Sequence, residues 1–97
     1  MNMKKTDLPF AYPINYVTGK EYTEGNVARL LQTEMHDQRW ATFKQWKSVG
    51  YKVKKGSKGT MLIKIVSVVN KRYKNGEKKQ VPNRFYVFNI TQVEEIK

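Results

Sequence analysis

Basic and aromatic side chains are interspersed along the middle of this chain in a pattern suited to binding a polyanion. Between Arg39 and Arg84 the sequence has fourteen Lys and Arg residues, five aromatic residues and a single acid, Glu77. Cations can neutralise phosphates, and aromatic rings can stack on unpaired bases whatever their sequence. A stretch of one sign also repels itself, and a polyanionic partner would relieve that repulsion. The pattern therefore indicates a nucleic acid-binding surface.

The net charge of +11 belongs mainly to this region, because residues 1–38 contain four basic and five acidic residues. Phosphate contacts are predicted for cations in a short helix, a short strand, a glycine-containing loop and a basic arm with its return strand. These cations are Lys44, Lys47, Lys52, Lys54, Lys55, Lys58, Lys71, Arg72, Lys74 and Arg84.

The aromatic residues among these cations have two alternative roles, in the core or on the binding surface. Phe43 and Trp46 lie three residues apart on one face of a predicted helix, which favours the core. Tyr73 lies on a polar arm, which favours base stacking, and Trp40 fits either role. The predicted stacking residues are Trp40, Tyr51, Tyr73 and Tyr86.

The loop at residues 54–59, Lys-Lys-Gly-Ser-Lys-Gly, combines cations with glycines that let backbone N–H groups approach an anion. It lacks the spacing of a Walker A loop. A phosphate-binding loop and a plain hairpin loop both fit this sequence.

The composition argues against several classes of protein. The chain has no cysteine and one histidine, His36, so disulfides, thiolate metal sites and imidazole pairs are excluded. No acidic cluster in the basic region could hold Mg²⁺, so we expect neither catalysis, nor a cofactor, nor a metal. Apolar runs are short and interrupted, as at Lys64, and the sequence shows no signal peptide, so we expect a cytoplasmic protein without a membrane partner.

The elements that must position these residues suggest one domain over residues 1–97, with 1–12 as a flexible lead-in. A first helix is predicted to start with Asn26 as its N-cap. A second spans about residues 42–49, where Thr42 and Gln45 form a capping box and Gly50 ends the helix.

The second half of the chain predicts strands. Residues 61–69 are apolar at both odd and even positions, with Lys64 as an exception. This pattern is typical of a central strand covered on both sides. Asn75-Gly76 predicts a tight hairpin whose return strand, 84–90, would place Ile63 opposite Phe88 and Ile65 opposite Tyr86. Residues 71–79 would then project as a basic arm. The predicted fold is α+β, with short helices packed on an antiparallel β-sheet and a protruding basic β-hairpin.

Several short motifs, read in order, resemble one family. They are Asn15-x-x-Thr18-Gly19-x-x-Tyr22, Arg39-Trp40-x-Thr42-Phe43-Lys44-Gln45, Gly50-x-x-Val53-x-Lys55-Gly56-x-Lys58-Gly59-Thr60 and Val87-Phe88-Asn89-x-x-Gln92. This series, over about residues 13–93, is similar to the N-terminal domain of the ArdC antirestriction family. Two positions depart from the family pattern, because Tyr16 replaces a usual proline and Gly25 falls one position late.

The resemblance implies that the protein binds single-stranded DNA without sequence preference and that it is encoded on a mobile genetic element. The protease domain of longer family members, with its H-E-x-x-H motif, is not carried over to this sequence. Arg39, Gln45 and Asn89 match motif positions, and each could instead hold loops through side-chain hydrogen bonds to the backbone. A stand-alone copy is also similar to the small DNA-binding protein encoded beside a primase-like polymerase in staphylococcal chromosomal cassettes, which suggests a polymerase or primase partner.

Two alternatives to a single-stranded DNA binder stay open at this point. The basic face could dock on an acidic protein partner such as a polymerase subunit, or it could bind double-stranded DNA or RNA.

Overall fold

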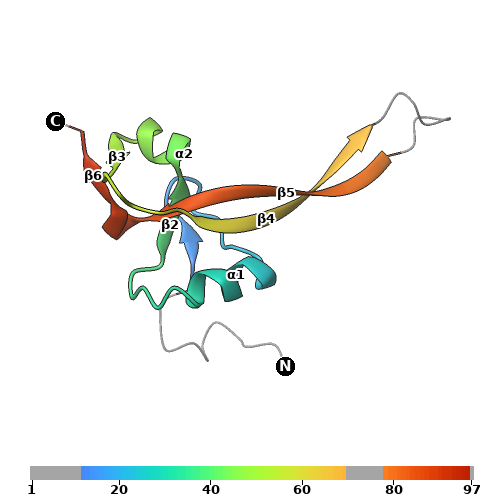
Figure 1. Cartoon of the computed structure of the whole chain (residues 1–97), viewed down its shortest axis with the longest axis horizontal. Coiled ribbons are helices and arrows are strands. Elements are labelled where there is room, and N and C mark those ends of the chain that lie inside the picture. The colour runs from blue at the N-terminus through green and yellow to red at the C-terminus, as the bar shows by residue number, and fades with distance from the viewer. Residues whose placement is uncertain (1–11, 70–77, 97) are drawn as a thin grey trace.

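The computed structural model describes residues 12–69 and 78–96 and confirms the α+β prediction. Two short helices lie against strands that are mostly antiparallel (Figure 1). The elements are β1 (Ile14–Asn15), α1 (Glu24–Leu31), β2 (Arg39–Thr42), α2 (Phe43–Ser48), β3 (Tyr51–Val53), β4 (Thr60–Val69), β5 (Lys78–Asn89), the 3-10 helix η3 (Ile90–Gln92) and β6 (Val93–Glu95).

The main sheet has the strand order β1-β2-β5-β4, and β3 pairs with β6 in a second, two-stranded sheet. Strand β4 therefore lies at an edge, and the prediction of a central strand covered on both sides is wrong. Its apolar residues divide between the two faces: Leu62 is fully buried, whereas Ile65 on the opposite face is 59% exposed. Apolar residues on both parities thus do not require cover on both sides.

The register of the β4–β5 pair also differs from the prediction. Ile63 lies opposite Arg84 and Ile65 opposite Pro82, four residues away from the expected partners. The prediction assumed a two-residue turn at 75–76, whereas the described strands end at Val69 and Lys78, and the turn lies outside the described residues. Since four is an even number, every side chain keeps its predicted face.

The core consists of two clusters on opposite faces of the main sheet. Successive strand residues point to opposite faces, so the neighbours Trp40 and Ala41 belong to different clusters. Helix α1 covers one face through Leu30, and α2 covers the other through Trp46 (Figure 1). The full clusters are Leu30, Trp40, Leu62 and Val87 on the first face, and Ala41, Trp46 and Val93 on the second.

Helix α1 begins earlier than predicted, because its N-cap is Thr23 rather than Asn26. Asn26 lies inside the helix, where its buried amide pairs with the free edge of β4. Its Nδ2 donates to the Ile63 carbonyl, and its Oδ1 accepts from the Ile63 N–H, both at 3.0 Å. The asparagine side chain therefore pairs with backbone groups of a strand edge and does not cap a helix.

Helix α2 confirms the predicted capping box, in which Thr42 Oγ1 accepts from the Gln45 N–H while the Gln45 side chain accepts from the Thr42 N–H. The φ of +88° at Gly50 supports its predicted role as the helix stop. Trp46 is fully buried as expected, but Phe43 is 54% exposed, so its assignment to the core is wrong. The helix has only six residues, and Phe43 occupies its first position, at the end away from Trp46.

Strands β4 and β5 continue beyond the helices as a long two-stranded ribbon (Figure 1). The ribbon forms the base of the predicted basic arm. Four predicted site residues, Lys71, Arg72, Tyr73 and Lys74, lie outside the described residues.

Candidate nucleic-acid interface

The predicted phosphate-binding cations within the described residues are all exposed to solvent. Helix α2 carries Lys44 and Lys47, and β5 carries Arg84. The others lie on β3 and in the loop that follows it: Lys52, Lys54, Lys55 and Lys58. The structure thus leaves these side chains on the surface, where a polyanion can reach them.

The loop at residues 54–59 is held to η3 by two hydrogen bonds with Gln92. The Gln92 carbonyl accepts from the Lys54 N–H at 2.8 Å, and the Gln92 Nε2 donates to the Lys58 carbonyl at 3.0 Å. Gly56 adopts a φ of +86°, which allows the sharp turn. These two hydrogen bonds hold both ends of the loop against η3.

Two cations of this region already have partners. Lys52 lies 3.7 Å from a carboxylate oxygen of Glu94, and the Lys54 ammonium donates to the Thr91 carbonyl at 3.2 Å. Both side chains are exposed, so these weak contacts can be exchanged for phosphate contacts.

The predicted stacking residues differ in their access to solvent. Trp40 is fully buried on β2 and donates its indole N–H to Gln38 Oε1 at 3.1 Å, so its predicted stacking role is wrong. An inner strand covered by α1 gives its ring no open face. Tyr86 is 55% exposed, and Arg84, two residues earlier on β5, shares its face of the ribbon.

Tyr51 belongs to a small aromatic group on the α2 side of the sheet. Its ring meets Trp46 edge-on at 5.3 Å, and Tyr16 stacks on Trp46 at 5.0 Å between ring centroids. The Arg39 guanidinium lies 6.0 Å from the centroid of the Tyr16 ring, which is itself partly exposed. We did not predict Tyr16 as a site residue, although its departure from the family's proline was a signal that could have identified it.

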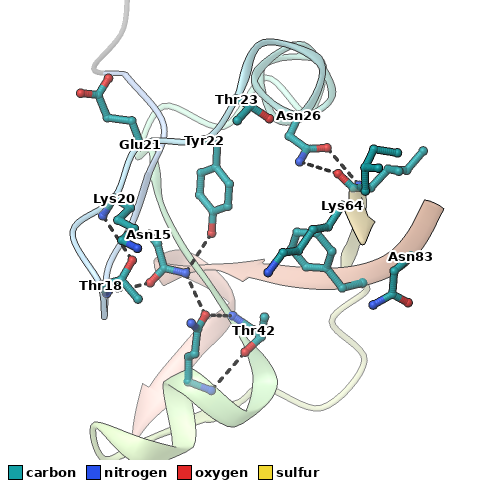
Figure 2. Close-up of a pocket in the computed structure, with 14 residues that line it drawn as sticks. Asn15, Thr18, Lys20, Glu21, Tyr22, Thr23, Asn26, Thr42, Lys64 and Asn83 are labelled. Carbon is teal, nitrogen blue, oxygen red and sulfur yellow. Dashed lines mark hydrogen bonds between the residues drawn. The ribbon is translucent and has the colours of Figure 1, made fainter. Parts of the chain in front are cut away.

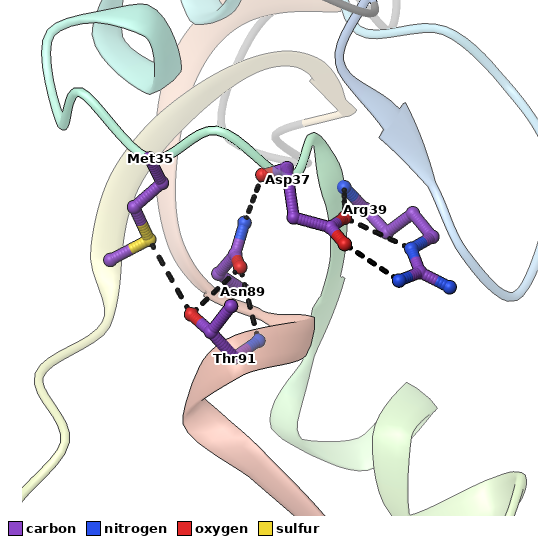
Figure 3. A network of polar contacts seen from close by, with 5 residues as sticks. All are labelled: Met35, Asp37, Arg39, Asn89 and Thr91. Carbon is purple, nitrogen blue, oxygen red and sulfur yellow. Dashed lines mark hydrogen bonds and ion pairs between the residues drawn. The ribbon is translucent and has the colours of Figure 1, made fainter.

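The motif residue Asn89 has a structural role, as Figure 3 shows. Its Nδ2 donates to the Asp37 carbonyl at 2.6 Å, and its Oδ1 accepts from the N–H and hydroxyl of Thr91. The same segment carries an ion pair of 2.6 Å between Arg39 and Asp37, and the Arg39 hydrogen bond holds the pKa of Asp37 below its ordinary value. Asn89 is fully buried, so it is not available to a ligand.

A pocket of about 770 Å³ opens between an N-terminal segment, residues 15–23, and the β4–β5 ribbon (Figure 2). Several of the motif residues that carry the family resemblance line it. The lining comprises Asn15, Thr18, Lys20, Glu21, Tyr22, Thr23, Asn26, Thr42, Gln45, Ile63, Lys64, Ile65, Asn83 and Phe85.

Asn15 organises one wall of this pocket. Its Oδ1 accepts from the N–H groups of Val17 and Thr18, and its Nδ2 donates to Gln45 Oε1 at 2.8 Å and to the Tyr22 hydroxyl at 3.2 Å. Burial raises the pKa of Tyr22 to about 12, although the Asn15 hydrogen bond acts in the opposite direction. Gln45, predicted as a motif residue of the site, is thus engaged in holding Asn15 and the start of α2.

Lys64, the cation that interrupts the apolar run of β4, is a pocket residue that sequence reasoning missed. Figure 2 shows its side chain reaching across the pocket toward Tyr22 and Asn15. Its cross-strand partner is Asn83, which also lines the pocket. The signal was present as an unexplained charge in an apolar strand, but the sequence alone did not show what this lysine faces.

Within residues 12–69 and 78–96 there is no group of three or more His, Asp or Glu side chains arranged to hold a metal ion. None of the helices in this part of the chain is long and apolar enough to cross a membrane.

Comparison with known proteins identifies the fold. Residues 2–93 match the family model of the N-terminal domain of anti-restriction factor ArdC. The metal-free crystal structure of the antirestriction protein ArdC from plasmid R388 matches 89% of the chain, with a TM-score of 0.75 and 28% identity. The Mn(II)-bound structure of the same protein gives a TM-score of 0.73 with 26% identity.

The sequence is also similar to part of a DNA primase. It is 47% identical over 53 residues to DNA primase TraC of Escherichia coli, and 42% identical over 48 residues to a second protein of that name. The matched region spans 4% of each primase, and the structural match spans about a third of ArdC. The similarity is therefore to one domain of larger proteins.

Proposed function

The chain belongs to the family of ArdC N-terminal domains, and on that premise we propose that it binds single-stranded DNA without sequence preference. Its role would be that of an accessory to a replication or priming enzyme of a mobile genetic element. Such a protein would work in the bacterial cytoplasm.

The observation that supports the proposal is the exposed face of the ribbon near the basic loop. Arg84 and Tyr86 lie side by side on that face, so a cation and a ring are presented together. Gly59, at the end of the loop, packs so closely that a Cβ placed there would lie 3.0 Å from the Tyr86 Cβ. The end of the basic loop therefore lies against the ribbon face that carries Tyr86.

The electrostatic part of the proposal is tested by titrating labelled single-stranded and duplex oligonucleotides of equal length at several salt concentrations. If about five phosphates are neutralised, the logarithm of affinity should fall with log salt at a slope of roughly −3.5. A flat salt response, or tighter binding of the duplex, would overturn it.

The stacking part is tested with Tyr86→Ala, which should weaken binding by about 1–3 kcal/mol if the ring stacks on a base. Ile96→Ala, which also truncates a half-exposed apolar side chain, serves as the control and should leave affinity unchanged. Tyr73→Ala is expected to have a similar effect to Tyr86→Ala. Binding equal to wild type in both tyrosine variants would remove stacking from the proposal.

The likeness to a DNA primase supports a second role, in which this domain docks on a primase or polymerase of the same element. Capture of the enzyme from an extract, with and without nuclease, distinguishes a protein contact from a DNA bridge. Loss of capture after nuclease treatment would leave only the DNA-binding role.

A further inference from the structure

We propose that the pocket between the N-terminal segment and the β4–β5 ribbon accepts one unpaired nucleotide of the bound strand. The inference rests on the proposed function, because it assumes that a single strand lies on the adjoining ribbon face. It assigns a ligand to the pocket and a role to Lys64, which the surface described above does not include.

The size and walls of the pocket suit a nucleobase. Its volume of about 770 Å³ falls in the range of small-molecule sites. The rings of Tyr22 and Phe85 line it together with Ile63, so a flat base would meet aromatic and aliphatic surface. A bare phosphate would gain nothing from these apolar walls.

The pocket also offers hydrogen-bonding groups that its own structure does not use. The Tyr22 hydroxyl accepts from Asn15, but no residue of the described chain accepts its proton. Like any tyrosine hydroxyl, this group carries its proton at neutral pH and can donate. The Asn83 amide, which likewise has no partner among the described residues, can both donate and accept. A neutral donor and an amide are compatible with the edge of any base, in keeping with binding that ignores sequence.

Charge in the pocket favours the phosphate of such a nucleotide. Lys64 extends over the pocket, and Lys20 lines its N-terminal side. The carboxylate of Glu21, the single acid in the lining, points away from the centre in Figure 2. An anion entering here meets ammonium groups rather than acids.

The topology lets a strand reach the pocket from the exposed ribbon face. Strand β2 ends at Thr42, opposite Val87 of β5. From Val87 toward Lys78, no described strand pairs with the edge of β5 that faces away from β4. Asn83 and Phe85, which line the pocket, alternate with Arg84 and Tyr86, which face the opposite side. A DNA strand that lies on Arg84 and Tyr86 can therefore pass one nucleotide around the free edge of β5 and into the pocket.

The test uses the whole protein and NMR signals of the side-chain amides of Asn15, Gln45 and Asn83 as reporters of the pocket. Two single-stranded oligonucleotides of equal length are compared, one intact and one abasic at every position, each at several salt concentrations. We expect both to bind, but only the intact strand to shift the three amide signals strongly. Thymidine monophosphate should produce smaller shifts of the same signals, whereas deoxyribose 5-phosphate should produce none.

The variant Lys64→Met should weaken binding of the intact strand by about tenfold, because it removes a charge-assisted contact. It should weaken binding of the abasic strand much less. Lys79→Met is the matched control, since Lys79 is an exposed cation farther out on β5 and outside the pocket. This control should affect the two strands equally.

The outcomes separate this inference from the proposed function. If the protein binds neither strand, both proposals fail. If it binds the intact strand but the amide signals do not move, or if Lys64→Met behaves like Lys79→Met, only the pocket proposal is overturned. Binding of free thymidine monophosphate without binding of either strand would make the pocket a mononucleotide site and would overturn both proposals.

Discussion

Single buried asparagines hold together segments that lie far apart in this chain. Asn15 ties the N-terminal turn to α2, Asn26 ties α1 to β4, and Asn89 ties the end of β5 to the segment before β2. No buried side-chain nitrogen or oxygen among the described residues lacks a hydrogen-bond partner. Because an unpaired buried polar group is costly, removing any one of these amides should lower the free energy of unfolding.

Replacing Asn26 with alanine should lower the free energy of unfolding by about 1–3 kcal/mol, because the N–H and C=O of Ile63 lose their partners. Chemical denaturation measures this change. Gln32→Ala, at an exposed position at the end of the same helix, should have little effect. Equal stability of the two variants would show that water replaces the asparagine without loss.

The ion pair of Asp37 predicts a dependence of stability on pH. The Arg39 hydrogen bond lowers the pKa of Asp37 in the folded protein. The stabilisation is therefore complete above the unfolded pKa, near 4, and is lost as the pH falls through the lower folded pKa. The melting temperature of wild type should exceed that of Asp37→Asn at pH 7, and the gap should narrow below about pH 4.

Arg39→Gln removes the other partner of the pair and should reproduce the flatter pH profile of Asp37→Asn. A gap between wild type and both variants that stays constant down to pH 2.5 would mean that this pair does not govern the acid response.

Among the elements, those with local signals were predicted well and those that depend on distant pairing were not. The start of α2 could be predicted because Thr42 and Gln45 interact over three residues. The position of β4 at an edge could not, because it depends on which strands lie beside β5. Asn26 was misread for the same reason, since its partner, Ile63, is 37 residues away.

The cap of α2 allows a test at the scale of one element. Thr42→Ala should destabilise the protein by about 0.5–2 kcal/mol, because the Gln45 N–H loses its acceptor. Thr42→Ser keeps the hydroxyl and should retain most of the stability in the same thermal or chemical unfolding experiment. If serine proved as damaging as alanine, the methyl group rather than the cap would be responsible.

Over the whole molecule, the basic surface could be predicted from charge, but its aromatic contacts could not. The predicted cations within the described residues are exposed, as long charged side chains usually are. Trp40 and Phe43 were both misassigned: the burial of Trp40 depends on the helix that covers its face of the sheet, and the exposure of Phe43 on its place at the start of the short helix α2. The pocket beside Lys64 could not be foreseen, since it joins segments that meet only in the fold.

The contribution of the basic loop can be measured at this scale. Replacing Lys54, Lys55 and Lys58 together with glutamine should make the salt slope of single-strand binding shallower by about 2, if each lysine contacts one phosphate. The same three positions changed to arginine keep the charge and should keep the slope. An unchanged slope in the glutamine variant would place the DNA path away from this loop.

The two clusters on opposite faces of the sheet have a consequence for how the molecule opens. The two clusters share no residue among those described, and they are connected through β2 and β5 and through the hydrogen bonds of Asn15 to Tyr22 and Gln45. Cooperative units of this kind can open separately, each with its own free energy. Amide hydrogen exchange should therefore show two sets of rates, one for α1 and one for α2 with β3 and β6, while β2 and β5 exchange only when both clusters have opened.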